Sequence, residues 1–99
     1  SHESRSVAFS ASGFYFDFYL VFNAYWQPLE FELPLLPPDR TAWQRVIDTS
    51  MPSPEDIVTT DTAVPVLEPT YPVDARSVAV FISPSRNGKL SPFLETPNQ

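Results

Sequence analysis

The side chains best suited to catalysis in this sequence are carboxylates. A pair of Asp or Glu residues can hydrolyse a glycosidic bond, one acting as acid and the other as base or nucleophile. Glu30 and Glu32 are two positions apart, which places both carboxylates on one face of a β-strand. Leu29, Phe31 and Leu33 alternate with them. Because an amphipathic strand with its polar face in water has the same pattern, we interpret the two glutamates as solvent-exposed.

The other ionisable residues are explained by local structure. Ser53-Pro54-Glu55-Asp56 predicts one helical turn, with a serine cap, proline at the first helical position and two acids near the positive end of the helix dipole. Asp17 lies among aromatic residues, and we expect a cross-strand arginine such as Arg45 or Arg76 to neutralise it. The single histidine, His2, has no partner nearby in the sequence and is expected to be solvated.

Sequence patterns typical of catalytic centres are missing from this chain. There is no nucleophile motif, no glycine-rich phosphate loop and no spacing of His, Asp and Glu typical of a metal site. The serines near the start have no visible base. We therefore predict no catalytic residue, no cofactor and no metal in this chain.

Three aromatic residues, Tyr25, Trp26 and Trp43, are candidates for contacts at the surface. Flat rings on a β surface can stack on sugar rings. Rings of this kind also fill the rim of a sandwich or pack against a neighbouring domain. We therefore predict that these three residues make either a sugar contact or an interdomain contact.

Two alternating segments within Tyr15–Leu33 organise the chain. Positions 16 to 22 carry Phe, Phe, Leu and Phe at the even numbers and a mixed set of residues at the odd numbers. Leu29–Leu33 alternates in the same way. A period of two predicts β-strands with one buried face. The short break at Asn23–Pro28 predicts that the two strands form an antiparallel hairpin.

The remaining strands follow from the same reasoning. Residues 76–83 are apolar almost throughout, which predicts a central strand covered on both faces. Other strands are predicted at residues 5–11 and 43–48, with proline-broken edge pieces at 64–67 and 70–73. We predict an all-β fold, an antiparallel β-sandwich of about six to eight strands with Greek-key-like connections.

Length and composition limit the possible functions. A chain of 99 residues predicts one domain. Its net charge of −6 argues against nucleic acid or an anionic membrane surface as a partner, because few cations are present to neutralise phosphates. The absence of cysteine excludes a disulfide scaffold and a thiolate metal site, and it is compatible with a reducing compartment. No signal peptide and no apolar stretch long enough to cross a bilayer are visible, so we expect a cytoplasmic location.

Three blocks of sequence carry a resemblance to a known family. They are LVFNAYWQPLEFELP at 20–34, WQRVIDTSMPSPEDI at 43–57 and YPVDARSVAVFIS at 71–83. In this order they resemble the C-terminal domain of isoamylase-type glycogen debranching enzymes, which belong to the α-amylase superfamily. The opening SHESRSVAF is similar to the start of that domain, just after the catalytic barrel. The resemblance runs from about Ser1 to Ser83.

The resemblance implies that the chain is a fragment of a longer enzyme. The parent enzymes hydrolyse α-1,6 linkages in glycogen or limit dextrins with acids on a separate (β/α) barrel, whose motifs are not in this sequence. No catalytic residue therefore carries over. The domain in this family is a β-sandwich packed on the barrel, so we expect a non-catalytic accessory domain at 1–83 and a disordered tail at 84–99. Its expected partners are the barrel of the same parent chain and, through the parent, glycogen or α-glucan.

Two other functions stay open at this point. One is an α-glucan-binding module that uses Tyr25, Trp26 and Trp43. The other is an independent adhesion or protein-binding sandwich, which would require a secretion route. In isolation, the accessory domain should expose an apolar patch where the barrel was, with Tyr25, Trp26 or the start of the chain contributing to it. A homodimer of the isolated domain could form through that patch.

Overall fold

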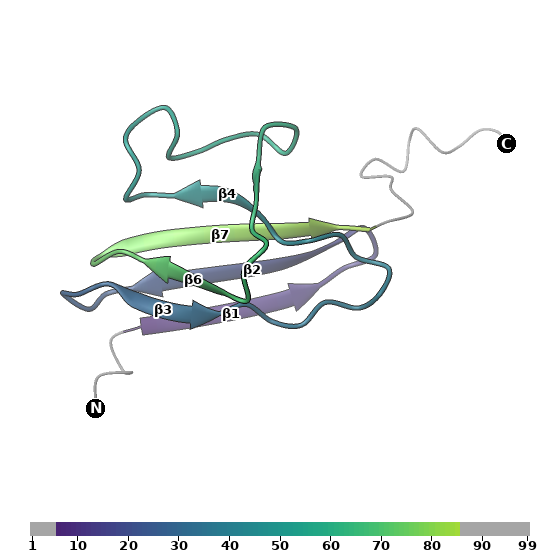
Figure 1. The fold of residues 1–99 in the computed structure, drawn as a ribbon, viewed down its shortest axis with the longest axis horizontal. Helices are drawn as coiled ribbons and strands as arrows, with labels where there is room; N and C mark the ends of the chain where they lie inside the picture. Colours follow the sequence, from purple (N-terminus) through teal and green to yellow (C-terminus); the bar gives the residue numbers. More distant parts are fainter. Residues whose placement is uncertain (1–5, 86–99) are drawn as a thin grey trace, which may run out of the picture.

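The computed structural model describes residues 6–85, and every regular element within this range is a β-strand. The strands form two antiparallel sheets, shown in Figure 1. Their bounds are β1 (Ser6–Ser12), β2 (Phe16–Asn23), β3 (Leu29–Glu32), β4 (Gln44–Asp48), β5 (Val64–Pro65), β6 (Thr70–Val73) and β7 (Ser77–Pro84). The predicted all-β sandwich is confirmed.

The larger sheet has five strands in the order β1-β2-β7-β4-β5. Strand β7 lies between β2 and β4 and pairs with both, so the predicted central strand is confirmed. Strand β5 is short, contains Pro65 and forms one edge of the sheet, as expected for a proline-broken piece. Strand β1 forms the other edge and is paired along its length with β2.

Strands β3 and β6 form the second, two-stranded sheet. The predicted hairpin between the two alternating segments is therefore wrong, because β2 pairs with β1 and β7 while β3 pairs with β6. The reason lies in Asn23, which is fully buried at the end of β2. Its side-chain amide donates hydrogen bonds to the carbonyls of Val73 and Asp74, at 3.0 and 3.1 Å. These bonds tie the break after β2 to the end of β6, so the chain continues into the second sheet instead of turning back.

The two faces of β2 have different surroundings. Asp17, Tyr19, Val21 and Asn23 point inward, between the sheets, and all four are buried. The face made of three phenylalanines and Leu20 points outward and is half-buried or exposed. Alternation along the strand is confirmed, and the buried face is the one that mixes apolar and polar side chains.

The core between the sheets consists of Tyr19, Val21, Trp43, Val73, Ala79 and Phe81. The Tyr71 ring packs edge-on against the Phe81 ring, with centroids 5.0 Å apart. The Tyr19 ring lies 5.9 Å from that of Trp43 and 6.0 Å from that of Phe81. Aromatic residues from both sheets and from the loop before β4 therefore fill the centre.

Strand β4 explains the imperfect alternation at residues 43–48. Its pairing with β7 shifts between Arg45 and Ile47, so one extra residue interrupts the period of two.

The loop that follows β4 contains no helix, and the predicted helical turn at residues 53–56 is wrong. The Glu55 N–H donates to the Pro52 carbonyl at 2.8 Å, which closes a simple turn, and the Ser53–Pro54 peptide bond is cis. The Asp56 carbonyl accepts from the Asp48 N–H at 2.9 Å, so the backbone pairs back to β4 instead of continuing as a helix. Disorder is predicted for the tail at 84–99, and the residues of that tail from 86 onward lie outside the described range.

Candidate functional site

The loop between β2 and β3 presents aromatic side chains to solvent. Trp26 is 59% exposed, and its ring lies 5.5 Å from that of Tyr25 with an angle of 50° between the ring planes. The loop is held from both sides, because the Tyr25 N–H donates to the Asn23 Oδ1 at 2.9 Å and the Tyr25 carbonyl accepts from the Arg76 N–H at 3.2 Å. The two rings are tilted, so the loop offers one exposed indole with a tyrosine beside it.

Trp43 has a different environment from the other two aromatic candidates. It is only 5% exposed, its ring packs against Tyr19, and its indole N–H donates to the Pro34 carbonyl at 2.9 Å. A ring in the core has no free face for a sugar or for a neighbouring domain. The structure therefore separates Trp43 from Tyr25 and Trp26, whose role in sugar or interdomain contact stays a prediction.

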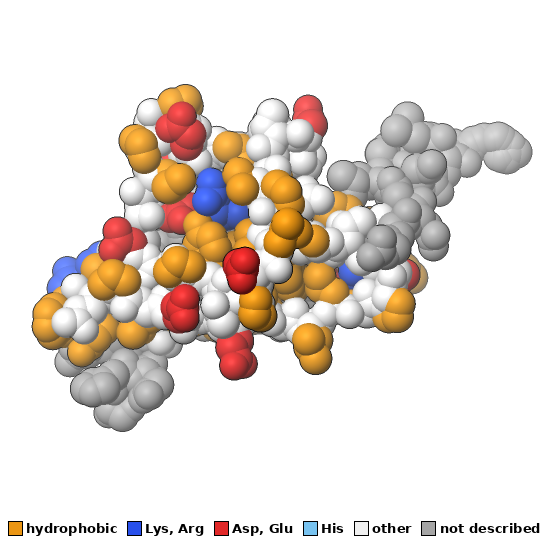
Figure 2. All heavy atoms as spheres, viewed as in Figure 1, with side chains coloured by type: hydrophobic (Ala, Val, Ile, Leu, Met, Phe, Trp, Pro, Cys, Tyr) orange, Lys and Arg blue, Asp and Glu red, His pale blue; other side chains and the backbone are white. Residues whose placement is uncertain are grey.

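The acidic residues suspected of glycosidase chemistry do not converge. Glu30 and Glu32 are exposed on β3, opposite Pro72 and Thr70 of β6. Figure 2 shows the acidic side chains of the viewed face spread apart from one another. Among residues 6–85, no group of three His, Cys, Asp or Glu side chains could hold a metal ion. The surroundings of Glu30 and Glu32 are thus those of a solvated strand face.

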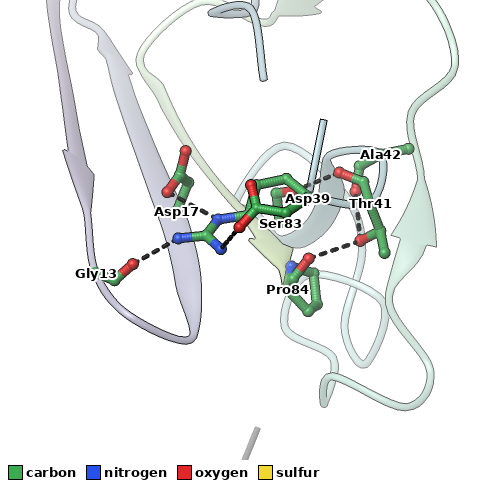
Figure 3. Close-up of polar contacts among 8 residues, drawn as sticks. Gly13, Asp17, Asp39, Thr41, Ala42, Ser83 and Pro84 are labelled. Carbon is green, nitrogen blue, oxygen red and sulfur yellow. Dashed lines mark hydrogen bonds and ion pairs between the residues drawn. The ribbon is translucent and has the colours of Figure 1, made fainter. Parts of the chain in front are cut away.

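Arg40 and Asp17 form a buried ion pair that the sequence did not indicate. The Arg40 Nε donates to the Asp17 Oδ1 at 3.1 Å, and the two side chains are 7% and 10% exposed. Figure 3 shows the contacts around this pair, in which the guanidinium also reaches the carbonyl of Gly13, at 2.5 Å, and Asp39, at 3.3 Å. The expected partners of Asp17, Arg45 and Arg76, are wrong.

The sequence missed Arg40 because it comes from the loop between β3 and β4, outside any strand. Three hydrogen bonds hold this loop against the end of β7. The Thr41 N–H and Oγ1 both donate to the Pro84 carbonyl, and the Ser83 hydroxyl donates to the Thr41 carbonyl. The cluster in Figure 3 therefore clamps the β1–β2 turn, the β3–β4 loop and the end of β7 together.

A second polar network lies between the sheets at Asp48. The Tyr71 hydroxyl donates to the Asp48 Oδ2 at 2.5 Å, and the Arg45 guanidinium donates to the Tyr71 oxygen at 3.0 Å. The other Asp48 oxygen accepts from the Ser50 N–H and hydroxyl. Burial raises the pKa of Tyr71, the hydrogen bond to Asp48 raises it further, and Arg45 opposes the rise. This network joins β4 to β6 and leaves no carboxylate oxygen of Asp48 without a donor.

The outward sides of β1, β2 and β7 form a continuous apolar surface. In the strand pairing, Leu20 lies between Phe9 and Val80, and Phe22 lies between Val7 and Val78. We call this surface the outer apolar face and define it as Val7, Phe9, Phe16, Phe18, Leu20, Phe22, Val78 and Ile82. Val7 and Phe9 are 56% and 58% exposed. The even-numbered apolar residues of β2 were visible in the sequence, but their exposure was not, because burial depends on where the second sheet packs.

The buried polar groups described above make structural contacts, and the exposed apolar side chains include those of the Tyr25–Trp26 loop and of the outer apolar face. Within residues 6–85 no helix has the length and hydrophobicity needed to span a membrane. A search of curated proteins finds no significant match. A scan against protein families matches residues 1–95 to the family described as "Isoamylase 1-3, C-terminal", beyond the expected limit at Ser83. Since that match covers nearly the whole sequence and agrees with the all-β sandwich, the chain belongs to the family of isoamylase C-terminal domains.

Proposed function

We propose that this chain is the non-catalytic accessory domain of an isoamylase-type debranching enzyme, which packs on the catalytic (β/α) barrel and supports it. Hydrolysis of α-1,6 linkages in glycogen or limit dextrin belongs, in this proposal, to the barrel. The observation that carries the proposal is the family match over residues 1–95, because the family consists of C-terminal domains of isoamylases.

The described polar groups support a structural role. Asp17 is paired with Arg40, and Asp48 accepts from Tyr71 and Ser50, so the buried carboxylates already have partners within the fold. A catalytic acid has to reach a substrate atom at hydrogen-bond distance. Breaking the Asp48 network would remove contacts that join the two sheets, and breaking the Asp17–Arg40 pair would release the loop between β3 and β4 from the larger sheet.

Deletion of the domain from the full-length enzyme tests the proposal. We expect the truncated enzyme to unfold at a lower temperature and to lose debranching activity on heating sooner than the full-length enzyme. The 99-residue chain alone, incubated with branched glucan, should release no linear chains. Unchanged thermal stability after deletion, or release of linear chains by the isolated domain, would contradict the proposal.

Binding of α-glucan by the domain itself is a second candidate, favoured by the exposure of Trp26 beside Tyr25. The two tryptophans make the test simple, because Trp43 is buried and a sugar in the loop would change mainly the fluorescence of Trp26. Titration with maltooligosaccharides should change the emission of the chain, and Trp26→Ala should abolish that change. No change at millimolar sugar removes this candidate without affecting the first.

A further inference from the structure

The outer apolar face differs from the rest of the described surface in its charge. Strands β1, β2 and β7 together contain one charged residue, Asp17, and it points inward to Arg40. The outward positions of these strands are therefore free of charge. On the second sheet, by contrast, β3 exposes Glu30 and Glu32. A charge-free sheet face with several half-exposed phenylalanines is typical of a surface that another protein surface covers.

The second sheet of the domain cannot cover this face. Strands β3 and β6 pack on the inner face, where Tyr19, Val21 and Phe81 are buried. On the outer side, Val80 of β7 is buried beside β4, but the neighbouring positions on β1 and β2 stay open, with Phe16 42% exposed and Phe22 39% exposed. The uncovered part therefore runs from β1 across β2 to Val78 and Ile82 of β7, which are half-buried.

The size of the face indicates what kind of partner could cover it. Three strands spaced about 4.8 Å apart, with about seven residues rising 3.3 Å each, give a flat footprint of roughly 300 Å². Contact with an equal area on a partner buries roughly 600 Å², which lies at the low end of interfaces between domains of one chain, about 600–1,500 Å². Stable complexes of separate chains need about 1,200–2,000 Å². The face is thus large enough for a tethered domain and small for an independent dimer.

The position of β1 indicates how this domain is linked to the preceding domain. In an isoamylase the rest of the polypeptide precedes its C-terminal domain, so the connection from the preceding domain arrives at Ser6, where β1 begins at the edge of the sheet (Figure 1). Val7, the next residue, belongs to the outer apolar face. A covalent link raises the effective concentration of the preceding domain at this face, which compensates for a modest contact area.

We propose that the outer apolar face is the surface through which this domain docks on the preceding, catalytic domain of the same polypeptide, with Phe9 of β1 and Phe22 of β2 in the contact. This inference rests on the proposed accessory function and adds the docking surface to it. It also excludes the Tyr25–Trp26 loop as the main interdomain contact.

Cysteine labelling tests the docking surface, because the natural chain has no cysteine. Phe9→Cys and the control Leu67→Cys are each introduced into the 99-residue chain and into the full-length enzyme. Leu67 is 82% exposed in the connection between β5 and β6, away from the outer apolar face. Labelling by a maleimide is followed at the peptide that contains each site. We expect the labelling rate at position 9 to be at least about tenfold lower in the full-length enzyme than in the isolated chain. The labelling rate at position 67 should be equal in the two proteins.

Three other results would overturn the inference. Equal labelling of position 9 in both proteins means that the outer apolar face stays open in the full-length enzyme. If deletion of the domain nevertheless destabilises that enzyme, the domain docks through another surface and the proposed accessory function still holds. Protection of position 9 in the isolated chain that grows with protein concentration identifies a second copy as the occupant. Protection of position 67 in the full-length enzyme shows that docking uses the opposite side of the fold.

Thermal unfolding of Phe9→Ser and Leu67→Ser gives a second measurement that does not depend on labelling. We expect Phe9→Ser to lower the unfolding temperature of the full-length enzyme by roughly two degrees or more and to change that of the isolated chain less, because Phe9 is half exposed there. Leu67→Ser should change neither. An equal loss in the isolated chain would mean that Phe9 acts only within the domain, which contradicts the inference.

Discussion

Replacement of Arg40 by Met tests how the fold is clamped. The guanidinium donates to Asp17 at 3.1 Å and to the Gly13 carbonyl at 2.5 Å, and its side chain is only 7% exposed. Methionine is unbranched, uncharged and reaches about as far as the Arg Nε, so Arg40→Met keeps the packing of the aliphatic stem and removes the guanidinium. The Asp17 carboxylate, with 10% of its side chain exposed, would then be buried without a countercharge.

The expected cost follows from that uncompensated charge. Breaking a buried ion pair by removing one partner costs about 3–5 kcal/mol. The contact of Arg40 with Asp39 adds little, because the Asp39 side chain is 57% exposed and exposed pairs contribute about 0–1 kcal/mol. For a domain of this size, each kcal/mol lowers the unfolding temperature by about 4–8 °C. We therefore expect a decrease of at least about 12 °C, a large part of the total stability of a small domain.

Chemical and thermal unfolding followed by circular dichroism measures this cost. Asp39→Asn is the matched control, because it removes the exposed partner of the same arginine and should cost less than about 1 kcal/mol. Adding Asp17→Asn to Arg40→Met should recover more than about 1 kcal/mol, since it removes the unpaired carboxylate. If Arg40→Met costs no more than Asp39→Asn, the buried pair does not clamp the strands and the reasoning is refuted.

Three further predictions concern the core, the Asp48 network and the backbone. Trp43→Ala should destabilise the domain by about 3–5 kcal/mol in urea unfolding, because it empties the centre of the core and leaves the Pro34 carbonyl without its donor. Tyr71 has a raised pKa in the folded chain, so its neutral phenol contributes fully to the free energy of unfolding below pH about 10. This contribution is lost as the pH rises from about 10 through the higher pKa of the folded state. Burial also raises the pKa of Tyr19, so absorbance titration should show two late-ionising phenols among the described tyrosines, of which Tyr71→Phe removes one. Arg76 has φ 56°, a region that β-branched residues avoid and glycine adopts freely, so Arg76→Val should lower the thermal unfolding temperature and Arg76→Gly should not.

Much of the fold was readable from local patterns. Alternation over residues 16–23 identifies β2, and the apolar run at 76–83 identifies β7 as the central strand. The prediction that both faces of β7 are covered is only partly right, because its outward Val78 and Ile82 are half-buried. The three sequence blocks indicated the family that the scan over residues 1–95 then matched. These features are local, since they depend on side-chain type and on the two-residue period of a strand.

The partners of individual residues could not be read in the same way. Asp17 pairs with Arg40 because the loop between β3 and β4 brings them together over 23 residues of sequence, while Arg45 of β4 donates to Tyr71. The predicted hairpin failed because buried Asn23 bonds to the end of β6, about fifty residues later in the chain. Trp43, one of three similar aromatic candidates, is in the core only because the second sheet packs over it.

What the sequence determined by itself is the strand class, the order of the strands along the chain and the family, since each follows from residue types and their spacing. Only the tertiary structure decided which face of β2 is buried. That choice depends on the position of the second sheet, which covers the side with Tyr19 and Val21, where Asp17 and Asn23 find their hydrogen-bond partners. The phenylalanines of the other side are left outward as the outer apolar face, because a two-layer fold covers only one side of each sheet.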